Sequence, residues 1–554
     1  MKNHKSISRR EFLNWFAAAT GASVGWDPIS TIISAVTSKY VSTAFAEEIV
    51  KQEVLRYVFI QNYGAPPRQH FDLFLNPNNE SIVFNQQMSN AYSVSSGKYT
   101  EGRYTAILKN GYYVPPLWGQ KTSATGRDIS ELLGSMLTIQ GIYGLNASHP
   151  FNAAIQTQPI PGGLSIGGLV ADHTSNPISA VAVGSSLAAY SYKSFKNKSL
   201  LQTSLGGVNQ AHSLFEPFKR NVAGNFSSQI DAVEEQVDSA IHQLNLINKK
   251  YSRVLVDHMS AKKLLKTAIG QYFDSWNPIY LKYTNLVKSA LSLDANFKGY
   301  ADRPIGIPTA DRDNRYSVAT GKNSTIDDLR SGINPAVTTI SFLAENFATA
   351  EFLLLNDYTR SFRMGTGSTL NNVDLAGRLT VPNDQHFIGY MPGILVNALH
   401  YRAYAACLLE LIDQLKQKID STTGQSYFHD TLIHFAGEFN RMPSYISHPN
   451  QLMGTSHGFR GSSASFFSGR FQNLQIVGDT LKSDKAGTRD VGSWGHAAKI
   501  ADLNNEYLTH SHLANSIAFM LNVPPLVTNA TSIIRKSGEN YVAAISRSKL
   551  VDNT

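Results

Sequence analysis

The stretch LRYVFIQ, at residues 55–61, is a short apolar run that leads directly into the loop sequence NYGAPP at residues 62–67. β-branched and aromatic residues dominate the run, and glycine and proline follow it, which is typical of a buried strand that ends in a loop. Three later runs have the same character, at residues 136–140, 180–183 and 432–436. We therefore predict four buried strands spread over most of the chain.

Helical sequence lies between and beside these strands. Apolar residues recur every three or four positions from residue 233 to about residue 254 and again from residue 408 to residue 419, which indicates one apolar helix face in each case. A connection rich in Gly, Pro, Asp and Asn at residues 296–335 separates the first helical block from another at about residues 340–355.

The alternation of helix and strand predicts an α/β fold, with a mixed, mostly parallel central sheet flanked by helices. Because strands lie at both ends of the chain and helices between them, residues 47–554 are predicted to form a single α/β domain. A mainly helical insertion at about residues 195–355 interrupts it.

The composition limits the class of protein. Of 554 residues, 42% are hydrophobic and 16% are charged, which excludes a disordered tail, a collagen-like fibre and a coiled-coil rod. The single cysteine, Cys407, excludes an intrachain disulfide and a cysteine-based zinc site, and we interpret it as a small core residue. The net charge is +8, of which +3 falls in residues 1–46. The remaining charge is dilute and no basic run is interleaved with aromatic residues, so we expect no nucleic-acid partner.

The N-terminus resembles a twin-arginine export signal. The sequence SRREFL at residues 8–13 is followed by a weakly apolar stretch at residues 15–26 and by the small-residue site Ala44-Phe45-Ala46. We expect the twin-arginine export machinery to recognise residues 1–46 and the mature protein to be periplasmic or extracellular, with no stable membrane insertion after cleavage. The alternative is an N-terminal amphipathic helix in which Arg9 and Arg10 are simply solvated.

Polar groups follow several of the predicted strands, where open α/β sheets carry their ligand sites. They combine carboxylates and imidazoles without a thiolate, a set suited to zinc, manganese or iron, or to calcium if the histidines do not bind. Each group alone also fits an ordinary surface turn. The groups are Arg68, His70 and Asp72; residues 146–150; residues 384–386, just before the second helix; and residues 438–441 with residues 454–458.

The order of these segments resembles a sulfatase-like family of secreted bacterial proteins, domain of unknown function fifteen-oh-one, within the alkaline-phosphatase-like superfamily. The motifs that carry the resemblance are YGAPP (63–67) with FDLF (71–74), NASHPFNA (146–153), LSIG (164–167), DQH (384–386), GEFNRMP (437–443), GTSHG (454–458) and IVGDT (476–480). Asn440 replaces a family Gly, Ser456 replaces an Asp, and the loop near Asp72 fits with a shift of a residue or two. The resemblance implies an alkaline-phosphatase-like fold.

The resemblance also implies a metal site. Its ligands would be Asp72, Asp384, His386, Glu438 and His457, and the cofactor would be a divalent metal such as zinc, manganese or calcium. The superfamily often has an Asp-His pair where this chain has Glu438-Phe439, so we expect a single metal ion or a degraded site.

Three further residues receive catalytic roles from the same resemblance. Ser148 is the candidate nucleophile, because SHPFN has the spacing of the sulfatase nucleophile pattern with Asn152 in place of Arg; the alternative is that Ser148 caps a helix. His149 is a candidate proton donor to the leaving group. Arg441 is a candidate for holding the oxyanion, and the alternatives are an ion pair with Glu438 or packing of a loop.

Two functions of different classes follow from these observations. The first is an exported metal-dependent hydrolase that acts on an anionic phosphate or sulfate ester. The second is a non-catalytic envelope protein that keeps the fold and binds a polymer or partner in the same cleft.

Overall fold

The computed structural model describes residues 54–74, 91–92, 99–100, 107–109, 111–144, 146–176, 178–184, 189–202, 239–240, 242–243, 246, 275–291, 305–306, 323–324, 341–366, 373–374, 380–381, 390–421, 423–444, 454–458, 460–482, 494–545 and 550–551. Residues Lys51–Ala211 and Ser275–Thr554 form one compact unit, which holds every element discussed below. The predicted export signal at residues 1–46 lies outside the described residues.

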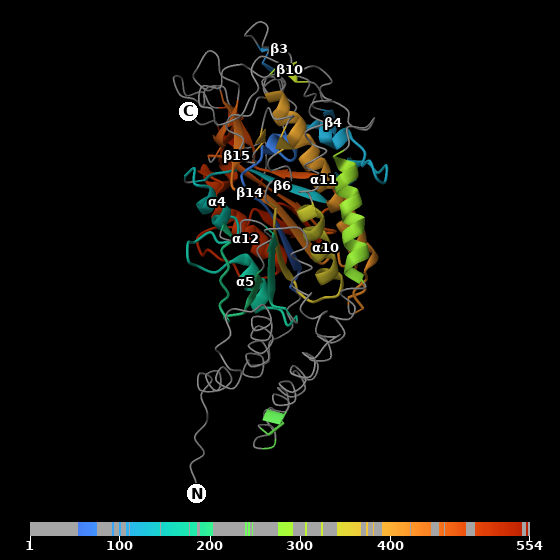
Figure 1. The fold of residues 1–554 in the computed structure, drawn as a ribbon. Helices are drawn as coiled ribbons and strands as arrows, with labels where there is room; N and C mark the ends of the chain where they lie inside the picture. The colour runs from blue at the N-terminus through green and yellow to red at the C-terminus, as the bar shows by residue number, and fades with distance from the viewer. Residues whose placement is uncertain are drawn as a thin grey trace, which may run out of the picture. The chain divides into compact units, whose positions relative to one another are not determined.

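The core of this unit is an eight-stranded sheet with the strand order β18-β6-β17-β14-β1-β11-β7-β8 (Figure 1). Five of the seven neighbouring pairs in this sheet are parallel, and β17 runs antiparallel to both of its neighbours. The strands are β1 Arg56–Asn62, β6 Met136–Ile142, β7 Ala180–Gly184, β8 Leu200–Gln202, β11 Ser361–Thr366, β14 Thr431–Gly437, β17 Ser462–Phe467 and β18 Gln475–Val477.

The four predicted strands are confirmed as β1, β6, β7 and β14. Every residue of β1, β6 and β14 is buried. Strands covered on both faces by helices read as continuous apolar runs, which is why the sequence alone revealed them. The prediction of an α/β fold with a mixed, mostly parallel sheet between helices is therefore confirmed.

Helices cover both faces of the sheet (Figure 1). On one face lie α10 Ser341–Leu355 and α11 Tyr390–Gln417, and the Phe435 ring of β14 contacts the rings of Tyr401 and Tyr404 from α11. On the other lie α5 Ile166–Asp172 and α12 His510–Leu521, which share an apolar core with β1, β6 and β14. In the part of the chain that the structure describes, no helix is long and apolar enough to cross a membrane.

A helix at residues 275–290 is joined to α10 and α11 by a lysine that contacts two carboxylates. The Lys282 ammonium lies 2.8 Å from the carboxylate of Glu351 on α10 and 2.7 Å from that of Glu410 on α11. This helix and α10 fall within the range predicted for the helical insertion, residues 195–355, whose remaining part is mostly outside the described residues.

Cys407 and His434 both lie in the core. Cys407 is fully buried on α11, and burial raises the pKa of its thiol well above the usual value. His434 lies within β14, where its Nδ1 is 2.9 Å from the Tyr57 hydroxyl and its ring stacks on Phe466. Burial lowers the pKa of His434 well below the usual value, so it is a neutral core histidine.

Candidate functional site

Three of the four predicted polar groups, those that follow β1, β6 and β14, lie at the carboxyl edge of the sheet. β1 and β14 are parallel and end in register, with Asn62 opposite Gly437. β6 points the same way, because it and β14 both run antiparallel to β17 between them. The loops after these three strands therefore begin at one edge, which is where α/β proteins place their ligand sites.

Two side chains that follow β14 form hydrogen bonds with both the N–H and the carbonyl groups of Gly64 and Ala65, just after β1. The Glu438 carboxylate accepts hydrogen bonds from the backbone N–H groups of Gly64, at 2.7 Å, and Ala65, at 2.8 Å. The Arg441 guanidinium donates to the carbonyl oxygens of Ala65, at 3.0 Å, and Gly64, at 3.1 Å. We call this arrangement the Gly64–Ala65 clamp.

The clamp accounts for an unusual backbone conformation. Gly64 has φ +96° and Ala65 has φ +49°, a region that residues with a side chain rarely adopt. Charge-assisted hydrogen bonds from both members of the clamp fix this conformation. The described bonds of Arg441 correspond to the loop-packing alternative, and a role for Arg441 in holding an oxyanion stays a prediction.

His149 lies against the clamp from a third segment. It begins α4, His149–Ile155, in the loop after β6, and its Nδ1 is 3.4 Å from Glu438 Oε1. Glu438 is buried, whereas the side chain of His149 is 18% exposed. A partly exposed imidazole beside a buried carboxylate has the geometry of an oriented acid–base group.

His457 completes this cluster. It belongs to β16 Gly454–Gly458, which pairs with β15 Asn440–Ser444, and it lies opposite Arg441 in that hairpin. Its ring meets the His149 ring edge-on at a centroid distance of 4.8 Å, and both rings pack on Phe439. Four of the predicted site residues, His149, Glu438, Arg441 and His457, are thus brought together from two distant parts of the sequence.

Two residues that the sequence analysis did not select adjoin this cluster. Gln156 Nε2 lies 3.4 Å from the backbone oxygen of Glu438 and 3.2 Å from Nε2 of His510, the first residue of α12. Burial lowers the pKa of His510 to about 4, so His510 is neutral at pH 7. No motif marks either residue, because only the packing of α12 beside α4 brings them to this edge.

Asn62 is the other residue that sequence reasoning missed. It is the last residue of β1 and is fully buried, yet within the described structure neither its Oδ1 nor its Nδ2 has a hydrogen-bond partner. Leaving a buried polar group unpaired costs about 1–3 kcal/mol, so such groups call for a ligand or an ordered water. The only sequence signal was a polar residue at the end of an apolar run.

Asp72 has a different environment from the other predicted ligands. Its carboxylate forms a bidentate ion pair with Arg68, with Arg68 Nε 2.6 Å from Oδ1, and also accepts a hydrogen bond from the Ser465 hydroxyl. Both members of the pair are almost fully buried. Burial raises the pKa of Asp72, against the opposing charge and hydrogen bonds of Arg68.

Ser148 occupies the N-cap position of α4 and is exposed, but its hydroxyl makes no capping hydrogen bond. Its backbone is fixed by two asparagines: Asn146 Oδ1 accepts from the Ser148 N–H at 2.9 Å, and Asn152 Nδ2 donates to the Ser148 carbonyl at 2.8 Å. Asn152 therefore braces the loop that carries Ser148.

The donors partly fit a metal ion. Glu438 and His457 supply a carboxylate and an imidazole, and a carboxylate that accepts two N–H groups retains further lone pairs. Asp72 does not fit, because its oxygens are engaged by Arg68 and Ser465. Asp384 and His386 lie outside the described residues, and among the residues described no group of three or more His, Cys, Asp or Glu could hold a metal ion.

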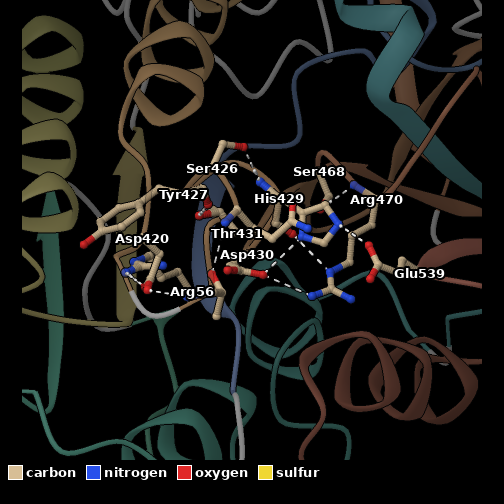
Figure 2. Close-up of polar contacts among 12 residues, drawn as sticks. Arg56, Asp420, Ser426, Tyr427, His429, Asp430, Thr431, Ser468, Arg470 and Glu539 are labelled. Carbon is tan, nitrogen blue, oxygen red and sulfur yellow. Dashed lines mark hydrogen bonds and ion pairs between the residues drawn. The ribbon is translucent and has the colours of Figure 1, made fainter.

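The opposite edge of the sheet carries a cavity of about 400 Å³, whose lining includes Phe428, His429 and Lys416. Beside it, Figure 2 shows a polar network in which His429 Nδ1 lies 3.3 Å, and Arg470 lies 3.0 Å, from the carboxylate of Asp430. The network ties the start of β14 to the end of β17. It contains none of the predicted site residues, and it supplies control positions for the experiments below.

The chain was compared with protein-family models, with curated proteins and with solved structures, and none of the three comparisons gave a match.

Proposed function

We propose that this protein is an exported member of the alkaline-phosphatase-like superfamily that hydrolyses phosphate or sulfate esters with the help of a divalent metal ion. One observation carries the proposal: at the carboxyl edge of the sheet the His149 imidazole lies 3.4 Å from the buried carboxylate of Glu438, and the His457 ring packs edge-on against His149. The amide of Asn62 at the same edge adds support, because it has no hydrogen-bond partner in the described structure and a bound ligand would supply one.

The metal ion would be held by Glu438 and His457 together with Asp384 and His386. When bound, it would lower the pKa of a coordinated hydroxyl and offset the charge that develops on the transferred group. Asp72 is left out of this set because Arg68 already neutralises it.

The chain's own residues have separate tasks in this proposal. Glu438 fixes the ring of His149, so that His149 gives a proton to the leaving-group oxygen as the ester bond breaks. Ser148 precedes His149 and is exposed, as a nucleophile must be. Within the Gly64–Ala65 clamp, the N–H groups of Gly64 and Ala65 keep Glu438 in place, and Arg441 fixes the same two residues through their carbonyl oxygens.

The test compares paired substrates. Phenyl and p-nitrophenyl esters of phosphate and sulfate are assayed with zinc, manganese or calcium added. We expect His149→Ala to lower kcat/KM for the phenyl ester about 10²–10⁴-fold, and much less for the p-nitrophenyl ester, whose leaving group needs no proton. Glu438→Gln and His457→Ala should lower the rate for both esters and reduce the bound metal.

The matched controls come from the polar network at the opposite edge, where Glu539 Oε2 lies 3.7 Å from His429 Nε2 (Figure 2). His429→Ala and Glu539→Gln should leave the rates unchanged. Equal loss for both leaving groups in His149→Ala would rule out its role as proton donor. For the export part of the proposal, N-terminal sequencing of protein from the cell envelope should begin at Glu47; finding Met1 there would contradict it.

A second function is a non-catalytic envelope protein that binds a polymer or partner at the same edge. The Gly64–Ala65 clamp favours it, because Glu438 and Arg441 are both engaged in holding a loop. Two results together would select this function over the first. The protein would hydrolyse none of the esters but still bind an anionic polymer, and His149→Ala would abolish that binding.

A further inference from the structure

Two adjoining loops next to α5 present apolar side chains to solvent. We call them the Phe195 loops, defined as residues 159–164 and 192–198. Phe195 is 75% exposed and Ile160 is 49% exposed. Phe195 has the largest exposed fraction among the large hydrophobic side chains of the described residues.

The Phe195 loops are rigidly built. The Asp172 carboxylate, at the end of α5, accepts hydrogen bonds from the Ser194 hydroxyl at 2.5 Å and from the N–H groups of Phe195 at 2.7 Å and Lys196 at 2.9 Å. A buried carboxylate therefore fixes the turn that carries Phe195, and the ring's exposure does not come from a loose loop.

The second loop is bonded to the first. The Lys193 carbonyl accepts from the Ser165 N–H at 3.1 Å, and the Lys193 ammonium donates to the Gly162 carbonyl at 2.6 Å. These bonds link the loop of Ile160 to the loop of Phe195, so the two apolar side chains belong to one fixed surface.

Positive charge surrounds these side chains. Residues 157–171 and 189–202 contain three lysines and no Asp or Glu, and the one nearby carboxylate, Asp172, lies buried beneath the turn. The ammonium groups of Lys193 and Lys196 donate to backbone carbonyls, and the single Asp172 carboxylate offsets only part of the charge of the three lysines. Burial, and then the neighbouring charge of Lys196, lower the pKa of Lys198, whereas the Asp172 carboxylate raises it.

We infer that the Phe195 loops dock the protein on the surface of an anionic lipid bilayer. Isolated apolar side chains at loop tips, ringed by lysines, enter the boundary between headgroups and acyl chains while the lysines meet the anionic headgroups. A protein partner would require a larger contiguous apolar patch than these two side chains supply. Since the turn is already fixed, little conformational entropy is lost on docking.

The test uses the full chain with vesicles of phosphatidylcholine alone and vesicles that also contain phosphatidylglycerol. We expect binding only to the anionic vesicles, weakened by salt. Phe195→Ala should weaken binding roughly tenfold, and Lys193→Glu by at least about fivefold. The matched controls are Leu281→Ala, which shortens a 58% exposed aliphatic side chain beside the ion-paired Lys282, and Lys536→Glu, at an exposed lysine of β23 Ile534–Ser537. Both should change binding little.

A local probe separates these loops from any contribution of residues 1–46. Since Cys407 is buried, a polarity-sensitive fluorophore on Phe195→Cys labels one site. Its emission should shift to the blue with anionic vesicles, and a label on Leu281→Cys should not respond. Unchanged emission from position 195, even in protein that sediments with vesicles, overturns the inference. An equal blue shift with soluble polyglutamate would assign the surface to an acidic polymer and would overturn it too.

Discussion

Replacing Asp72 by Asn tests whether this residue serves the fold or a metal ion. Asp72 is fully buried and Arg68 is 1% exposed, so the change removes the charge partner of a guanidinium that has no access to water. Breaking a buried pair from one side costs about 3–5 kcal/mol, because the remaining charge stays desolvated. We therefore expect Asp72→Asn to lower the free energy of unfolding by about that amount, and bound metal to remain unchanged in the folded protein.

The double variant Arg68→Met with Asp72→Leu provides the internal control. Removing both charges together leaves no unpaired ion, so its unfolding free energy should return to within about 1–2 kcal/mol of the original. Urea unfolding gives the free energies, and metal analysis of the same samples gives the stoichiometry. If Asp72→Asn lost its metal while its unfolding free energy changed by less than about 1 kcal/mol, the assignment of Asp72 to the ion pair would be refuted.

Three further outcomes are expected. The free energy of unfolding should fall as the pH drops from about 6.5 towards 4, by about 1.4 kcal/mol per pH unit for each buried histidine. The reason is that the unfolded chain binds protons that the folded chain does not. Urea unfolding at pH 7 and pH 5 measures this change, and equal stabilities would contradict it. Burial lowers the pKa of three such residues, to about 3 for His70 and His400 and to about 4 for His510. Gly168→Ala should destabilise the fold by about 1–3 kcal/mol because a methyl group would overlap the Lys193 carbonyl, whereas Gly134→Ala has open space and should be neutral in the same thermal melt. Asn62→Ala should weaken inhibition by inorganic phosphate at least tenfold yet shift the unfolding free energy by less than about 1 kcal/mol, since no hydrogen bond is lost; a large loss of stability with normal phosphate inhibition would point to a structural role.

The fold could be predicted from the sequence where strands are buried on both faces. β1 and β14 read as unbroken apolar runs, whereas β17, with the sequence SSASFF, and β11, with the sequence SFRMGT, do not. Both are nonetheless buried: the Ser465 hydroxyl of β17 reaches Asp72, and Arg363 of β11 donates to Gln61 on the neighbouring strand at 3.0 Å. Their polar side chains are satisfied only by tertiary partners, which no local pattern reveals.

The candidate site was predictable to the extent that its residues follow strands. Glu438 comes directly after β14 and His149 lies in the loop after β6, so the rule for sheet edges predicted that they lie together. Asp72 also follows a strand, but its carboxylate forms an ion pair with Arg68, four residues earlier in the chain. The order of residues in the sequence does not show which partner the carboxylate has. No motif marks Asn62, because what distinguishes it is a buried side-chain amide without a hydrogen-bond partner in the described structure, and sequence does not show this.

The Gly64–Ala65 clamp sets an order of events in synthesis. Its hydrogen bonds join residues between 373 and 377 positions apart. At roughly 5–20 residues per second, a ribosome takes on the order of 20–75 s to reach Glu438 after Ala65 has emerged. During that interval β1 is an apolar strand without β14 beside it and the loop after it has no partner, so the nascent chain needs protection from aggregation. In the proposed twin-arginine export of folded protein, the clamp closes late, because synthesis must pass Arg441 before transport begins.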